Sequence, residues 1–300
     1  MKKTIFLFNL IGVFLLFSCS EEQLREPETR FPNDGDPALN EWIKENFTDP
    51  YNIQVVYAWK TAGSDLGVDL VPPKLGVIQP FLKIVMKVWG QPYVKTSPEG
   101  AIFLKKSTLR EFRLFGKDHS FAAATADNGY RITMYGVDGF TPSTLGKYSK
   151  AMLIYFFHTV HHEYGHILNQ MYNYDPEFIK ISGPDYKADF NAYPRYQALS
   201  WGFVSNYAMS APGEDFVEVL SIYVTSTIAE WNALLEEARA ADERVRIETG
   251  EVRQGRDRIM RKQAAVDKYM RQIYEIDIDT LRYHVINAIN EVVDGNIEIN

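Results

Sequence analysis

The run His162-Glu163-Tyr164-Gly165-His166, near the middle of the 300-residue chain, constrains fold and chemistry more than any other stretch. On an α-helix, residues four apart lie one turn apart on the same face, so both imidazoles can reach one metal ion. Glu163 is rotated from them by about 100°, toward the open side of that ion. The pattern therefore predicts a helix that carries two neutral nitrogen ligands for zinc and one carboxylate for proton transfer.

The motif alone does not establish a metal site, and a third ligand elsewhere in the chain would support it. A chain with six histidines contains His-Glu-x-x-His by chance in about one case in a hundred. Metzincins continue the motif with a glycine and a third histidine at fixed positions, but this chain has Asn169 and Tyr172 at those positions. The metzincin form is therefore excluded, and the third ligand must come from another part of the chain.

An acidic segment further along the chain supplies the candidates. Glu214 and Glu218 lie one turn apart in a strongly helical stretch, which places both on one face. One carboxylate can ligate zinc, while the other accepts the ring N–H of a ligating histidine and fixes its tautomer. The chemistry alone leaves open which carboxylate has which role. Asp215 is rotated by about 100° and is expected to cap the start of this helix.

Two other residues of the motif helix carry expectations. His158 stands one turn before His162, and we expect it to be a buried, hydrogen-bonded histidine and not a ligand. Gly165 costs about 1 kcal/mol relative to alanine inside a helix. We therefore expect the helix of Glu214 to pass close to that position.

The composition is that of a globular chain, with 46% apolar and 14% aromatic residues. The formal net charge is −7, and basic residues form no cluster. Nucleic acid is therefore a poor candidate for a partner.

The N-terminus indicates export. A short basic start precedes an apolar run over residues 5–17, which is too short for a typical membrane span and predicts a signal peptide over residues 1–18. Cys19 ends a Leu-Phe-Ser-Cys sequence that resembles a bacterial lipobox, so we expect cleavage before Cys19 and lipidation of its thiol. Because it is the single cysteine, no intrachain disulfide can form. Residues 19–37 form the expected lipidated tether, and residues 38–300 the expected single catalytic domain.

The remaining patterns predict an α+β fold. Asp36 is expected to cap a first helix, and a long, buried motif helix is expected over residues 149–172. We expect strands at residues 51–59, 101–104, 111–115 and 130–135. Further helices are expected at residues 77–88, 214–237, 238–271 and 280–293, with the stretch 238–271 interrupted at Gly250 and Gly255. This order predicts a small antiparallel sheet followed by a mostly helical C-terminal part.

The motif, Tyr207 and the segment from Glu214 to Glu218 together resemble the zincins of the anthrax-lethal-factor type. With the lipobox, the chain is most similar to the zinc-binding metallopeptidase lipoproteins of Bacteroidetes, called substrate-import-associated zinc metallohydrolase lipoproteins. The motif match covers about residues 155–223, and it departs at Val217, where alanine is usual. The resemblance implies a gluzincin-like, zincin-fold catalytic domain, one zinc ion and a setting beside TonB-dependent import systems of the outer membrane.

The resemblance also implies residue roles. It assigns Glu214 as the third zinc ligand and Glu218 as the acceptor behind a ligating histidine. Tyr207, seven residues before Glu214, stands where similar zincins carry a tyrosine that stabilises the oxyanion. The full predicted set comprises the ligands His162, His166 and Glu214, the general base Glu163, the oxyanion donor Tyr207, the orienting Glu218 and the lipidated Cys19.

The sequence therefore predicts a zinc metallohydrolase, most simply a peptidase, that is anchored in the cell envelope by lipid alone and feeds nutrient import. The outer membrane is the expected location, and the acidic Glu21-Glu22 pair is similar to tags for surface export. The alternative is an inactive zincin-fold binding or accessory lipoprotein of an import system. The intact Glu163 argues against that alternative, because a binding module has no use for a general base. Hydrolysis of a non-peptide amide stays open.

Overall fold

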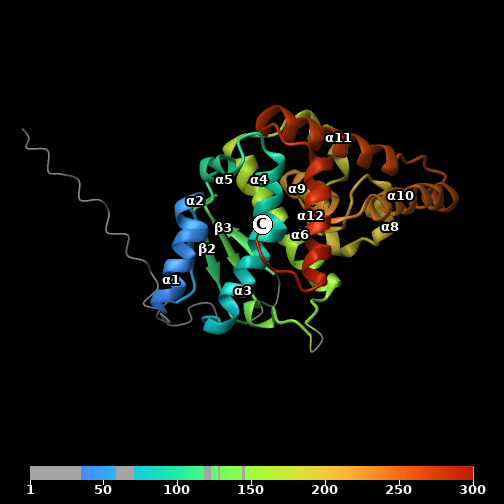
Figure 1. The fold of residues 1–300 in the computed structure, drawn as a ribbon. Helices are drawn as coiled ribbons and strands as arrows, with labels where there is room; N and C mark the ends of the chain where they lie inside the picture. The colour runs from blue at the N-terminus through green and yellow to red at the C-terminus, as the bar shows by residue number, and fades with distance from the viewer. Residues whose placement is uncertain (1–34, 59–70, 118–122, 128, 144–145, 300) are drawn as a thin grey trace, which may run out of the picture. The chain divides into compact units, whose positions relative to one another are not determined.

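A computed structural model describes residues 35–58, 71–117, 123–127, 129–143 and 146–299 (Figure 1). These residues belong to one compact unit that spans residues 32–300. The predicted signal peptide, the predicted lipidation site Cys19 and nearly all of the predicted tether lie outside the described residues. Among the described helices, none combines the length and the apolar character that crossing a membrane would require.

The N-terminal part is largely helical. Its helical segments are α1 (Pro37–Ile43), η1 (Lys44–Thr48), α2 (Asp49–Tyr51), α3 (Leu75–Val85), η2 (Met86–Gly90), α4 (Gln91–Thr96) and α5 (Ala101–Lys106). The predicted cap is confirmed, because the Asp36 carboxylate accepts a hydrogen bond from the Leu39 amide at 2.9 Å.

The strand predicted at residues 101–104 is wrong, because this segment forms α5. Phe103 and Leu104 are buried side by side, whereas Ile102 is 54% exposed. A strand would instead point alternate residues to the same face. A short apolar run does not distinguish helix from strand by itself, and here the packing selects the helix.

The sheet has four strands, β1 (Gln54–Val56), β2 (Glu111–Leu114), β3 (Ala124–Asp127) and β4 (Arg131–Met134), in the order β1-β2-β4-β3. The predicted antiparallel sheet is corrected to a mixed one, since β1 pairs with β2 and β2 with β4 in parallel. The helices between β1 and β2 provide the crossover that parallel pairing requires. Only β3 runs antiparallel to its neighbour β4, with Ala126 opposite Ile132. This strand was not predicted, and it forms one edge of the sheet.

The motif helix α6 (Lys150–Met171) is confirmed, and Ser149 caps its start. It is not buried on every side as expected. Phe156 and Phe157 are buried in the core, but Tyr155 is 62% exposed. The apolar run before the motif therefore contains one solvent-facing position.

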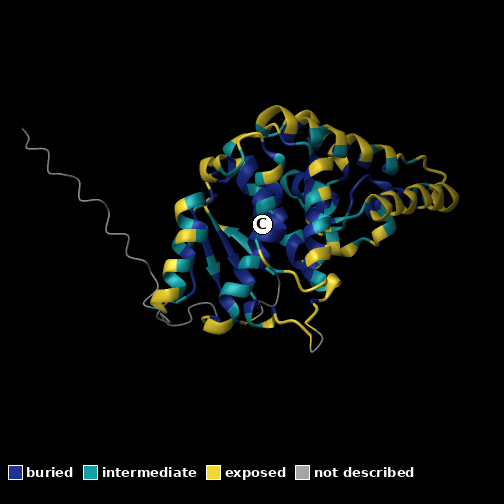
Figure 2. Cartoon of the chain, viewed as in Figure 1, coloured by how far each residue is buried: buried dark blue, intermediate teal, exposed yellow. Residues whose placement is uncertain are grey.

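The C-terminal part is helical, as predicted, with short segments before the long helices. These are α7 (Glu177–Lys180), η4 (Gly183–Asp185), η5 (Phe190–Ala192), α8 (Arg195–Ser200), η6 (Tyr207–Met209), α9 (Pro212–Thr225), α10 (Ile228–Thr249), α11 (Gly255–Tyr274) and α12 (Ile278–Val293); η3 (Val137–Gly139) precedes α6. The helix predicted at residues 214–237 is split where Thr227 and Glu230 form a capping box at the start of α10. Figure 2 shows exposed residues along the outer faces of α10 and α11.

Helix α9 packs against α6, and the prediction for Gly165 is confirmed. A Cβ atom at Gly165 would lie 2.9 Å from Cγ1 of Val217 on α9. Real Cβ atoms do not approach a neighbour that closely, so a side chain at this position would push the two helices apart. The glycine lets the histidines of α6 face the carboxylates of α9.

The cap predicted at Asp215 is wrong. Helix α9 begins at Pro212, so Asp215 falls inside the first turn, and its side chain is fully buried toward α11. Its carboxylate pairs with the Lys262 ammonium at 2.6 Å and accepts a hydrogen bond from the Tyr186 hydroxyl at 2.8 Å. Lys262 also donates to the Gly202 carbonyl at 2.7 Å. This buried pair joins α9, α11 and the segment that leads toward Tyr207.

Candidate metal centre

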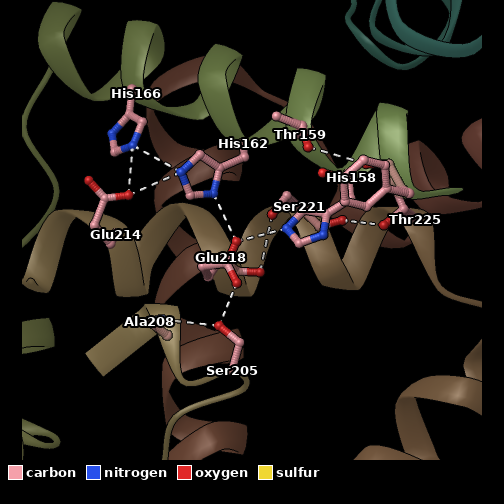
Figure 3. Close-up of polar contacts among 11 residues, drawn as sticks. His158, Thr159, His162, His166, Ser205, Ala208, Glu214, Glu218, Ser221 and Thr225 are labelled. Atoms are coloured by element: carbon pink, nitrogen blue, oxygen red, sulfur yellow. Dashed lines mark hydrogen bonds and ion pairs between the residues drawn. The ribbon is translucent and has the colours of Figure 1, made fainter. Parts of the chain in front are cut away.

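The three predicted ligands meet between α6 and α9 (Figure 3). His162 Nε2 and His166 Nε2 lie 3.1 Å and 3.2 Å from the same carboxylate oxygen of Glu214. The two imidazole nitrogens are 3.2 Å from each other. The atoms thus form a nearly equilateral triangle on facing helices.

The triangle suits zinc. Ligand atoms at about 2.0–2.1 Å from a tetrahedral ion lie about 3.3 Å from one another, close to the spacing of His162, His166 and Glu214. Two imidazole nitrogens and one carboxylate oxygen are also a donor set that zinc prefers, with a fourth position left for water or substrate. Because the His166 and Glu214 side chains are 23% and 24% exposed, solvent can reach that side.

Glu218 occupies a different place from Glu214. Its Oε1 lies 2.9 Å from Nδ1 of His162, the ring nitrogen on the far side from the triangle. A neutral imidazole that offers Nε2 to a metal carries its proton on Nδ1, and this N–H points at Glu218. The structure therefore places Glu214 beside both Nε2 atoms and Glu218 behind one ring.

Two further donors hold Glu218. His158 Nε2 lies 2.7 Å from Oε1, and the Ser205 hydroxyl donates to Oε2 at 2.5 Å. Burial alone would raise the pKa of Glu218, but the hydrogen bonds from His158 and His162 hold it well below its usual value. The expectation that His158 is hydrogen-bonded is confirmed, although its side chain is 30% exposed and not buried.

His158, His162 and Glu218 could also hold a metal by proximity, since their ligand atoms lie within 4.8 Å of one another. The tautomer of His162 decides between the two groups. Its neutral ring can offer only one nitrogen lone pair, and the Nε2 side has both a second imidazole and a carboxylate. His162, His166 and Glu214 are therefore the better metal-binding group, and His158 and Glu218 support it by hydrogen bonding.

The carboxylates also set the proton affinity of the metal-free cluster. Burial would lower the pKa of His162, but hydrogen bonds to Glu214 and Glu218 raise it to about 9. The pKa of Glu214 would be raised by burial and is instead held well below its usual value by His162 and His166. A metal must therefore displace a proton from this cluster, which makes metal binding depend on pH.

Glu163 contacts the sheet. Its Oε2 accepts a hydrogen bond from the Ala126 amide at 2.8 Å. Burial raises the pKa of Glu163 above its usual value. Ala126 lies on β3, so its contribution was missed together with that strand. The Asp127-Asn128-Gly129 turn signal, which implies a strand on each side, could have indicated it.

Tyr207 begins η6 and lies beside the cluster. Its ring centroid is 5.7 Å from that of His162, and it is 43% exposed. Burial and the neighbouring Glu214 raise the pKa of its phenol well above the usual value. At neutral pH the hydroxyl therefore keeps its proton and can donate it in a hydrogen bond. Phe190 packs edge-on against the same ring at 5.5 Å.

Comparisons with known proteins agree with this geometry. The chain is similar to the crystal structure of a putative zinc-binding metallo-peptidase from Bacteroides caccae, with a TM-score of 0.70 and 27% identity, covering 89% of this chain and 98% of that one. Among curated proteins, none matches significantly. A family model described as "putative zinc-binding metallo-peptidase" matches residues 34–279, and the chain therefore belongs to this family.

Proposed function

We propose that the protein is a zinc-dependent peptidase with one zinc ion, held by His162, His166 and Glu214. The observation that carries this proposal is the triangle of two Nε2 atoms and one carboxylate oxygen with sides of 3.1–3.2 Å. A zinc ion bound there would supply Lewis acidity, which polarises a substrate carbonyl and lowers the pKa of a water molecule.

Glu163 would serve as the general base. It would accept a proton from the attacking water and pass it to the leaving amine. The Ala126 amide holds its carboxylate in one orientation at 2.8 Å. Burial raises its pKa above the usual value, which makes the carboxylate a stronger proton acceptor.

Tyr207 would donate its hydroxyl hydrogen to the substrate oxygen as negative charge develops there. A well-placed donor of this kind contributes about 3–4 kcal/mol to transition-state stabilisation. The raised pKa of the phenol supports this role, because an ionised tyrosine would repel the oxyanion.

The edge strand favours a peptide over another amide as the substrate. In the β3–β4 pair, Thr125 lies opposite Thr133, while the amide of Ala126 points away from β4 toward Glu163. The outer edge of β3 therefore faces the site. An open strand edge can bind an extended peptide through backbone hydrogen bonds.

We further propose that lipidation at Cys19 anchors the protein in the cell envelope, at the outer membrane, where it would supply peptides to a TonB-dependent import partner. The anchor is supported by the Leu-Phe-Ser-Cys sequence after a signal-peptide pattern, with the single cysteine at the required position. The outer-membrane setting and the import partner follow from the family resemblance alone. Metabolic labelling with palmitate tests the anchor: the wild type should be labelled and Cys19→Ser should not. Equal labelling of both would contradict it.

The peptidase proposal is tested by metal analysis of the purified protein and by cleavage of a peptide library. We expect one zinc per chain and cleavage that Glu163→Gln reduces by about 10²–10⁴-fold, with the exposed Glu177→Gln as the matched control. One zinc without cleavage of any peptide by the wild type would contradict the peptidase proposal and favour the binding alternative.

A further inference from the structure

One hydroxyl connects the metal centre to the turn that carries Tyr207. Ser205 Oγ donates to Oε2 of Glu218 at 2.5 Å and accepts a hydrogen bond from the Ala208 amide at 3.0 Å (Figure 3). A serine hydroxyl can donate and accept at once, and donation to a carboxylate is stronger than donation to a neutral acceptor. The backbone just after Tyr207 is thus tied to the carboxylate behind His162.

The Tyr207 ring of this turn lies 5.7 Å from that of His162, whereas the neighbouring residues of the turn contact other parts of the fold. Asn206 Nδ2 donates to the carbonyls of Tyr193 and Phe190 at 2.6 Å and 3.3 Å. Ala208 and Met209 are fully buried in the core. These contacts fix the turn to its own loop and to the core, and Ser205 adds the link to Glu218.

We propose that Ser205 is a positioning residue that holds the Tyr207 hydroxyl in place relative to the metal, acting through Glu218. The proposal rests on the donor role of Tyr207 given above. Glu218 then serves two parts of the site through its two oxygens. Oε1 orients the His162 ring at 2.9 Å, and Oε2 anchors the turn through Ser205.

Removing the Ser205 hydroxyl leaves Oε2 of Glu218 and the Ala208 amide without this partner. Loss of one hydrogen bond of this type costs about 1 kcal/mol, which is about a five-fold change in an equilibrium constant. If Ser205 acts through Tyr207, this loss appears in the binding of an oxyanion only while the Tyr207 hydroxyl is present. A merely structural serine would lower stability and leave oxyanion binding unchanged.

The test is a double-mutant cycle on the affinity of the cobalt-loaded full chain for methylphosphonate, a tetrahedral anion, followed by the visible spectrum of the cobalt. We expect Ser205→Ala to weaken binding about five-fold and Tyr207→Phe, which removes a hydrogen bond to a charged acceptor, to weaken it about 10- to 100-fold. The double variant should bind no more weakly than Tyr207→Phe alone. Ser205→Thr, which keeps a hydroxyl, should bind like the wild type. Ser205→Gly serves as a second hydroxyl-free variant if Ser205→Ala does not fold.

Two results would overturn the proposal: fold-changes of the two single variants that multiply in the double variant, or wild-type affinity in Ser205→Ala. Metal affinity, measured by chelator competition, gives an independent comparison, because Ser205→Ala should weaken it less than Glu218→Gln does. None of these measurements requires turnover. A protein that shows the coupling but cleaves no peptide would retain the role of Ser205 and lose the peptidase proposal.

Discussion

Helix α9 carries the three acids Glu214, Asp215 and Glu218 close together, and they face two different neighbouring helices. Glu214 and Glu218 face the histidines of α6, where 24% of the Glu214 side chain is still exposed. Asp215 faces α11 and forms an ion pair with Lys262 in which neither side chain is exposed. Neighbouring carboxylates thus differ in whether their charge is available for chemistry or is neutralised inside the core. We therefore expect changes on the α6 side to affect metal and activity, and changes on the α11 side to affect stability.

The largest effect on activity without an effect on stability is expected at Glu163. Glu163→Gln removes the proton acceptor but keeps the shape and the contact with the Ala126 amide. Peptide hydrolysis should fall by about 10²–10⁴-fold, while the melting temperature and zinc content stay close to those of the wild type. Cleavage assays, thermal unfolding and metal analysis on one preparation check this. A variant that loses zinc along with activity would show that Glu163 has another role.

At Lys262 we expect a large loss of stability with little effect on metal binding. Lys262→Met leaves Asp215 as an uncompensated buried charge, and breaking such a pair costs about 3–5 kcal/mol of unfolding free energy. Denaturant unfolding measures the loss, and chelator competition on the remaining folded protein should give nearly wild-type zinc affinity.

The double variant Lys262→Met with Asp215→Leu is the control for this pair. Replacing both charges removes the buried lone carboxylate, so it should be less destabilised than the sum of the two single changes. Strict additivity would mean that the two charges do not stabilise each other.

A change at Glu218 should reduce metal affinity by an intermediate amount. Glu218→Gln weakens the acceptor behind His162, and loss of such a partner costs about 10- to 100-fold in metal affinity. Glu214→Gln, which alters a predicted ligand, should cost more. Chelator competition ranks the two variants, and a greater loss in Glu218→Gln would reverse their proposed roles.

The smallest expected effect is a pH dependence of the metal-free protein. The pKa of His162 is raised to about 9 in the fold, against about 6.5 when unfolded. Its protonated form therefore stabilises the fold below pH 6.5, and this stabilisation is lost as the pH rises toward 9. Thermal unfolding in the presence of a chelator should show the decline, and His162→Gln should flatten it. With zinc bound the decline should be absent. If the stability of the metal-free wild type did not fall between pH 6.5 and 9, the raised pKa of His162 would be contradicted.

The sequence was most informative where residues act through local periodicity. The one-turn spacings of His162 with His166 and of Glu214 with Glu218 predict shared faces whatever the rest of the chain does, and Gly165 indicated the close helix approach. Asp215 was assigned to the wrong partner because its environment depends on Lys262, far away in sequence. Whether it caps a helix or pairs in the core is decided by tertiary packing.

The features that the sequence did not reveal are those that depend on contacts across the fold. Strand β3 has a weakly strand-forming sequence and is fixed by pairing with β4 and by packing against α6, so the role of Ala126 was hidden with it. Ser205 carries no local signal at all. Its importance appears only when the turn before α9 is brought against Glu218.

Anomalous diffraction at the zinc absorption edge, from crystals of the zinc-loaded protein, tests the central proposal most directly. We expect one strong peak per chain, bonded to His162 Nε2, His166 Nε2 and a Glu214 carboxylate oxygen, with Glu218 hydrogen-bonded behind His162. A peak bonded to Glu218 in place of Glu214, or no peak between α6 and α9, would contradict the account.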